Sequence, residues 1–180
     1  MRLTISGLPG SGTTTVAKLL SHEFELELIS AGEMFRRIAK DKKLQLDQFS
    51  ELAENNDEFD RQIDEMQGKE AMKRDNAIIE SRLAGFFVSK ADLKIWLKAP
   101  SEIRASRIAG REGIAYEDAL STMKDRERSE HKRYEQYYGI NLDDLAIYDL
   151  VIDSSRWNEK DIVAMIKVAV DCVSKKDVFA

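Results

Sequence analysis

The sequence predicts an α/β fold in which helices flank a parallel sheet of five strands. Short apolar runs of strand length alternate with segments of helical periodicity, and this alternation is typical of a parallel sheet covered on both faces. A glycine-rich segment joins the first of these runs to the first helix. With 180 residues the chain can form one substantial hydrophobic core, so we expect a single domain over residues 1–180.

Five apolar runs are predicted to be strands because each is short and ends at a turn or a helix start. They are Leu3–Ser6, Leu28–Ile29, Ala77–Glu80, Leu93–Leu97 and Leu150–Asp153. Helical periodicity or a helix-start signal predicts helices between them at Thr15–Phe24, Gly32–Lys40, Asp47–Asn55, Asp57–Lys73, Pro100–Gly110 and Tyr116–Tyr138. A last helix is predicted to begin with Asn158 and Asp161 as its cap and to turn one apolar stripe towards the core.

Composition and charge exclude several classes of function. The net charge of −5 argues against general binding of nucleic acid, which is usually the property of a basic domain. No run approaches the roughly 18 apolar residues of a membrane span, and no signal-peptide pattern precedes the first strand, so we expect a cytoplasmic protein. The single cysteine, Cys172, excludes an internal disulfide and is predicted to be a core residue of the last helix.

A phosphate-binding P-loop is indicated by the segment Gly7-Leu8-Pro9-Gly10-Ser11-Gly12-Thr13-Thr14-Thr15, which follows a strand and opens a helix. Glycines let the backbone approach phosphates, the N–H groups and the helix N-terminus bind anions, and the Thr14 hydroxyl can ligate Mg²⁺. The segment departs from the P-loop pattern at Thr13, where a lysine that reaches the β- and γ-phosphates is expected. We therefore expect a nucleotide site whose positive charge comes from elsewhere; the alternative is a glycine-rich turn that binds nothing.

Two helix faces that carry arginines are candidates for that charge, because their side chains recur at helical spacing. They are Arg104, Arg107 and Arg111 on one helix, and Arg126, Glu130 and Arg133 on the next. Solvated faces with ion pairs are the ordinary interpretation of such patterns. In a P-loop protein without its lysine we expect instead a lid whose catalytic arginines, Arg104, Arg107, Arg126 and Arg133, close on the polyphosphate.

A site for a second phosphate is predicted where the second and third strands end, since ligands of open α/β sheets bind at that edge. Ser30 provides a hydroxyl there, and Arg36 lies within the following helix. Arg82 is a candidate for binding the acceptor phosphate. Glu80 is expected to hold Mg²⁺ through water, or else only to anchor loop residues.

Two acidic residues of the segment between these strands are further candidates. Asp60 and Asp64 are spaced by one helical turn and could accept hydrogen bonds from an exocyclic amine or from the lid arginines. A solvated acidic face is the equally good alternative.

Five segments in the same order resemble cytidylate kinase in its archaeal form. They are Gly7–Thr15, Ser30–Arg36, Glu80–Gly85, Asp92–Pro100 and Val151–Ser155. The resemblance implies the fold of a nucleoside monophosphate kinase, with a helical acceptor-binding insertion at about 33–75 and a short lid at about 108–133. It also implies that Ser30, Arg36 and Arg82 contact the acceptor and that Arg126, Glu130 and Arg133 form the lid and base site. Leu83 departs from the pattern of bacterial relatives, which carry an aspartate after the corresponding arginine.

With the acceptor that this resemblance implies, we expect transfer of the γ-phosphoryl group of ATP to CMP, and to dCMP, with Mg²⁺ and by a monomer that binds neither nucleic acid nor membrane. The acceptor phosphate, whose second pKa is about 6, is largely anionic at neutral pH and needs no general base. Two alternatives stay open. One is a P-loop kinase for UMP, AMP or a small hydroxyl compound, and the other is a nucleotide-binding module without catalysis.

Overall fold

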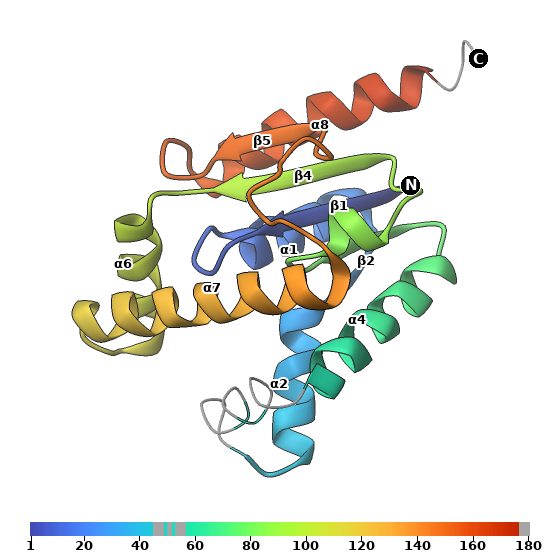
Figure 1. Ribbon diagram of the computed structural model, residues 1–180. Helices are drawn as coiled ribbons and strands as arrows, with labels where there is room; N and C mark the ends of the chain where they lie inside the picture. The colour runs from blue at the N-terminus through green and yellow to red at the C-terminus, as the bar shows by residue number, and fades with distance from the viewer. Residues whose placement is uncertain (45–48, 50–51, 53–56, 177–180) are drawn as a thin grey trace.

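The computed structural model describes residues 1–44, 49, 52 and 57–176. Its centre is a five-stranded parallel sheet in the order β2-β3-β1-β4-β5 (Figure 1). The strands are β1 (Arg2–Gly7), β2 (Glu27–Ser30), β3 (Ala77–Glu80), β4 (Leu93–Lys98) and β5 (Leu150–Asp153). All five strands predicted from the sequence are confirmed, with ends that differ by at most one residue.

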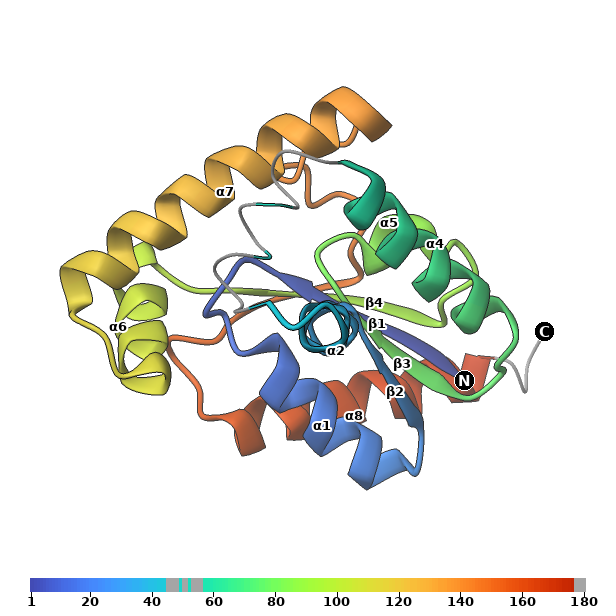
Figure 2. The same ribbon diagram turned by 90° about the horizontal axis from the view of Figure 1, so that it is seen from below.

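Helices lie on both faces of this sheet, as Figure 2 shows: α1 and α8 are on one side, and α4, α5 and α7 are on the other. The described helices are α1 (Thr13–Phe24), α2 (Ala31–Asp41), α4 (Asp57–Met72), α5 (Ala84–Phe87), α6 (Ser101–Glu112), α7 (Tyr116–Tyr138) and α8 (Glu159–Lys176). The sequence did not predict α5, because four residues are too few for a periodic signal. The helix predicted at 47–55 lies largely outside the described residues.

The main core fixes the position of the loop that follows β1. Leu3 and Ile5 of β1 are fully buried against Val16 and Leu20 of α1 and Ile166 of α8. Each such side chain contributes about 1.5–3 kcal/mol on burial. Since the core holds both β1 and α1, the loop between them has two fixed ends.

The predicted cap of the last helix is confirmed, whereas the predicted burial of its cysteine is wrong. The Asn158 side-chain oxygen accepts a hydrogen bond from the backbone N–H of Asp161 at 3.0 Å. Ile166 and Val170, one turn apart, face the core. Cys172 is exposed, because two residues beyond Val170 a helix has turned by about 200°.

The break between α6 and α7 lies later than predicted. Gly110 is helical, and α6 continues to Glu112. The helix ends at Gly113, whose φ of 69° is left-handed and whose N–H donates to Ala109 O. In the described part of the chain, no helix combines the length and the apolar composition that a membrane crossing requires.

Candidate active site

The ends of three adjacent strands bring the predicted site residues together. In the sheet register, Glu80 at the end of β3 lies beside Ser30 of β2 and beside Ile5 of β1. The P-loop follows β1, and α2 begins directly after Ser30. The phosphate loop and the predicted acceptor residues therefore share the carboxyl edge of the sheet, where such folds bind ligands.

The P-loop has the backbone conformation that its glycines allow. Gly10 and Gly12 have φ values of 80° and 93°, which side-chain-bearing residues rarely adopt. A Cβ atom on Gly10 would lie 2.6 Å from the carbonyl oxygen of Arg104. The loop closes through a hydrogen bond from Ser11 N–H to Leu8 O at 3.1 Å and leads into α1 at Thr13. The N-terminus of α1 is thereby presented at the loop, where it can bind an anion.

Four carbonyl groups of this loop accept hydrogen bonds from side chains of later segments. Three of the donors are guanidinium groups, and the fourth is a hydroxyl. The contacts are Arg82 Nη1 to Gly7 O at 2.8 Å, Arg104 Nη1 to Pro9 O at 3.0 Å, Arg107 Nη1 to Gly10 O at 3.3 Å and Ser154 Oγ to Ser11 O at 2.7 Å. The loop thus has positive charge around it although Thr13 stands in place of the lysine.

Arg104 lies behind the loop and is not part of a solvated helix face. Its side chain is 6% exposed and pairs with Glu127 of α7. Its Nε also donates to Ala99 O at 2.9 Å. The Arg104 side chain therefore connects the loop to α7, and its predicted catalytic role stays a prediction.

Arg107 lies at the edge of a cavity of about 290 Å³ that opens beside the P-loop. Its guanidinium donates to Ser154 Oγ at 3.0 Å and to Ser154 O at 2.7 Å. The cavity is lined by Gly10–Val16, Arg107, Ile108, Arg111, Ser154, Trp157, Glu159 and Ile162. Sequence reasoning gave Ser154 and Trp157 no role, although Ser154 directly follows β5 and so lies at the carboxyl edge of the sheet.

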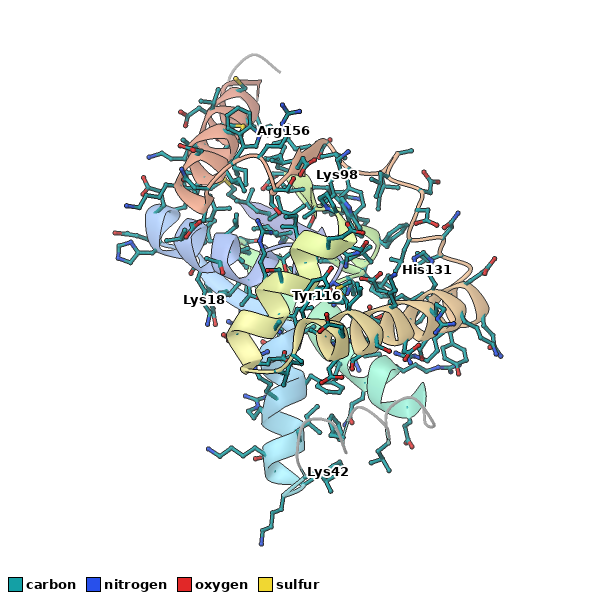
Figure 3. All side chains as sticks on the ribbon, turned by 90° about the vertical axis from the view of Figure 1, so that its left-hand side faces the viewer. Lys18, Lys42, Lys98, Tyr116, His131 and Arg156 are labelled. Carbon is teal, nitrogen blue, oxygen red and sulfur yellow. The ribbon has the colours of Figure 1, made fainter. Side chains whose placement is uncertain are left out.

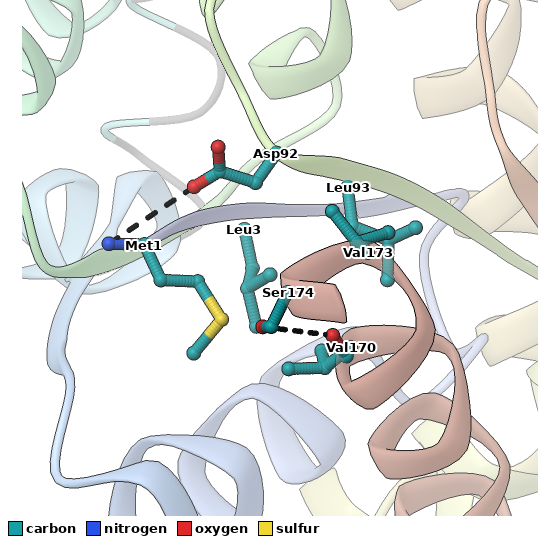
Figure 4. Close-up of a pocket in the computed structure, with 7 residues that line it drawn as sticks. All are labelled: Met1, Leu3, Asp92, Leu93, Val170, Val173 and Ser174. Carbon is teal, nitrogen blue, oxygen red and sulfur yellow. Dashed lines mark hydrogen bonds and ion pairs between the residues drawn. The ribbon is translucent and has the colours of Figure 1, made fainter. Parts of the chain in front are cut away.

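A second cavity, of about 210 Å³, lies at the opposite end of the sheet (Figure 4). It is bounded by Met1, Leu3, Asp92, Leu93, Val170, Val173 and Ser174. These residues belong to the amino ends of β1 and β4 and to the end of α8. The cavity is therefore separate from the P-loop site.

Glu130 of α7 joins the predicted acceptor arginine to a predicted lid arginine. Its two carboxylate oxygens accept hydrogen bonds from Arg82 Nε at 2.9 Å and Arg126 Nε at 2.8 Å. Burial of the Glu130 side chain, which is 4% exposed, acts to raise its pKa, but the two guanidinium groups outweigh burial and lower the pKa to about 2. Arg133 lies one turn further along α7, with its Nη1 2.6 Å from Ser129 Oγ.

Glu80 accepts hydrogen bonds from three hydroxyl groups. Oε1 is 2.7 Å from Thr13 Oγ1 and 3.2 Å from Thr14 Oγ1, and Oε2 is 2.5 Å from Ser30 Oγ. The Glu80 residue is 5% exposed. Thr14 and Glu80 offer oxygen ligands of the kind that Mg²⁺ prefers, usually together with phosphate oxygens and water. Within the described residues, no group of three or more His, Cys, Asp or Glu side chains is arranged to hold a metal ion.

The remaining predicted acceptor residues lie on the two helices between β2 and β3. Arg36 is exposed on α2, with its guanidinium beside the first turn at Gly32. Figure 3 shows α2 extending away from the sheet to Lys42 while α7 crosses the view above it. Asp60 and Asp64 fall on α4, and their side chains are outside the described part of the structure.

Comparison with known proteins identifies the family. A sequence model of the cytidylate kinase-like family matches residues 2–156. The chain belongs to this family. Cytidylate kinase of Methanosarcina barkeri is 49% identical to this cytidylate kinase-like protein over 174 residues, covering 95% of the chain and 97% of the relative. Cytidylate kinase of Pyrococcus horikoshii is 47% identical over 169 residues, covering 94% of the chain and 88% of the relative.

A solved structure supports the fold of this cytidylate kinase-like protein. Shikimate kinase of Bacteroides thetaiotaomicron aligns with a TM-score of 0.64 at 14% identity, covering 95% of this chain and 98% of that one. At this identity the similarity shows the P-loop kinase fold alone. The family itself rests on the two archaeal relatives and the matched residues.

The buried Glu130 predicts a pH-dependent contribution to stability. Because its pKa is lowered from 4.5 to about 2, ionised Glu130 stabilises the fold above pH 4.5, and the contribution is lost as pH falls towards 2. Glu130→Gln should lower the free energy of unfolding by about 3 kcal/mol at pH 6, and the difference from the wild type should shrink as pH falls to 3. Urea unfolding at a series of pH values measures this.

Glu135→Gln is the matched control, because Glu135 is exposed on the same helix. It should stay within about 0.5 kcal/mol of the wild type throughout. A difference between Glu130→Gln and the wild type that is constant with pH would contradict the assignment of the ionised carboxylate.

Proposed function

We propose that the chain transfers the γ-phosphoryl group of ATP to CMP, and to dCMP, giving ADP and the corresponding diphosphate. The observation that carries the proposal is the placement of two phosphate-binding arrangements at one sheet edge. The P-loop follows β1, while Arg82 follows β3 and donates to Gly7 O at 2.8 Å. A donor phosphate on the loop and an acceptor phosphate on Arg82 would be neighbours, as direct transfer requires.

ATP is the proposed occupant of the loop and its adjoining cavity. The backbone N–H groups of the loop and the N-terminus of α1 suit the β- and γ-phosphates. The cavity of about 290 Å³ beside the loop is open to the adenosine, with Trp157 as an aromatic surface for the base. Thr14, with Glu80 through water, would hold Mg²⁺, and the ion when bound offsets charge on the transferring phosphoryl group.

CMP is the proposed occupant of the space bounded by β2, β3 and α7. Ser30, Arg36 and Arg82 are assigned to its phosphate, and Glu130 to its nucleoside, together with Asp60 and Asp64. The chain as a whole carries a net charge of −5, so an anionic acceptor needs a local cationic group to bind. The arginines of this site provide such a group, which supports the assignment.

The proposed lid is the segment 108–133, which includes the turn at Gly113. Arg126 is half exposed and lies beside Arg82 through their shared partner Glu130. We therefore assign to Arg126 and Arg133 the role of stabilising the negative charge that develops on the phosphoryl group in the transition state. Arg107 acts at the loop itself, and Arg104 supports the loop from behind.

Phosphoryl transfer passes through a loose transition state, so the protein must mainly align the reactants, exclude water and offset charge. The acceptor oxygen is already anionic at neutral pH, and no side chain has to remove a proton from it. Consumption of ATP and CMP fits the cytoplasmic location expected from the sequence. The monomeric state stays a prediction.

A panel of acceptors tests the proposed reaction. With ATP and Mg²⁺, CMP should give ADP and CDP, dCMP should also react, and AMP should be much slower because the family match supports a cytidine site. Coupled detection of ADP with each monophosphate measures the rates. A faster reaction with AMP would refute the base assignment, and no turnover with any acceptor would favour a nucleotide-binding module.

The lid assignment predicts the kinetics of two arginine variants. Arg126→Ala and Arg133→Ala should each lower kcat by about 10³-fold or more while changing the KM for ATP far less, because the contacts form chiefly in the transition state. Steady-state kinetics measures kcat and the KM for ATP, and thermal melts check that each variant is folded. Arg128→Ala is the control, since Arg128 is 79% exposed on the same helix and pairs with Asp125, three residues before it. Near-wild-type kcat in both lid variants would exclude the lid role.

A further inference from the structure

The carboxylate of Glu80 connects the donor side of the site to the acceptor side. One of its oxygens accepts from Thr13 at the start of α1, and the other accepts from Ser30 before α2. Both bonds are buried, and their lengths are 2.7 Å and 2.5 Å. Hydrogen bonds to a charged group are stronger than neutral ones, especially away from water. The two loops are thus held to one point at the end of β3, the strand that lies between β2 and β1.

Ser30 transmits this contact to the proposed acceptor helix. Its hydroxyl donates to Glu80 and accepts from the backbone N–H of Glu33 at 3.3 Å, which makes it the N-cap of α2. Ser30 is 3% exposed, so water does not compete freely for the hydroxyl. The direction of the first turn of α2, and hence of Arg36 beyond it, therefore depends on where Glu80 lies.

Thr13 transmits the same contact to the donor loop. It is the first residue of α1, it is 7% exposed, and it occupies the position of the usual P-loop lysine. A threonine is too short to reach the phosphates that a lysine would bind, and its hydroxyl is directed at Glu80 instead. The residue change therefore converts a phosphate-binding position into a structural connection to β3.

We propose that Thr13, Glu80 and Ser30 form a clamp that couples the donor and acceptor sites, with Thr13 as a positioning residue. The clamp sets the separation of the two loops before any substrate binds. Loss of a hydroxyl on one side should then weaken binding on the other side. The identity of the two coupled ligands rests on the proposed kinase function, whereas the clamp itself rests on hydrogen bonds within the protein.

The test measures CMP affinity by calorimetry with ATP and Mg²⁺ absent. Thr13→Val removes the hydroxyl at nearly constant volume, and it should weaken CMP binding about five- to tenfold although Thr13 lies on the donor side. Thr13→Ser keeps the hydroxyl and should bind CMP like the wild type. In the reciprocal experiment, Ser30→Ala should weaken ATP binding by a similar factor with CMP absent.

Thr4→Val is the matched control, because Thr4 is a buried threonine of β1 whose hydroxyl has no hydrogen-bond partner among the described residues. It should bind CMP like the wild type. Unchanged CMP affinity in folded Thr13→Val would overturn the clamp.

If the wild type does not bind CMP, the acceptor assignment fails and the clamp is decided by urea unfolding of Thr13→Val, Ser30→Ala and the double variant. A midpoint shift in the double variant that differs from the sum of the single shifts supports the clamp. Additive shifts overturn it.

Discussion

The hydrogen bonds to the carbonyl groups of the P-loop are the interactions on which the rest of the site depends. A loop that binds phosphate must turn its N–H groups towards the anion, and its carbonyl groups then need partners elsewhere. In this chain, Arg82, Arg104 and Arg107 provide three of those partners. The same contacts surround the loop with positive charge, and we propose that this charge takes the place of the absent lysine.

The buried ion pairs of α7 extend this arrangement beyond the loop. Arg104 pairs with Glu127, and Arg82 pairs with Glu130, so two acidic residues of one helix hold two of the arginines that contact the loop. Buried pairs often contribute little net stability, because desolvation of both charges offsets their attraction. Their effect here is one of position, because each pair joins α7 to an arginine that contacts the loop.

The sequence predicted the framework of the protein well because strand, loop and helix signals are local. The five strands, the P-loop and the capped last helix all follow from short patterns. Pairing between distant residues carries no such signal. Nothing in the sequence distinguishes Arg104, which is buried, from Arg111, which lines the cavity, although both lie on one predicted helix face.

The same reason explains what was missed at the site. The sequence places Thr13 in the phosphate loop and offers Glu80 as an anchor for loop residues, but it does not pair the two. Glu80 lies 67 residues from Thr13, and the bond depends on the strand order. Ser154 lies in one of the five resembling segments, but the sequence gives it no role, because almost any hydroxyl can donate to a backbone carbonyl as Ser154 does. The apolar character of the last helix predicts a buried Cys172, whereas its angular position on α8 decides its exposure.

Binding of tripolyphosphate, which has no base or ribose, tests most directly whether arginines on the carbonyl side replace the lysine. Arg107→Ala should weaken tripolyphosphate and ATP binding by the same factor, about tenfold, because both ligands use the loop. Arg128→Ala, which removes an equal charge elsewhere on the protein, should leave both affinities unchanged. Tripolyphosphate affinity in Arg107→Ala equal to that of the wild type would contradict the account.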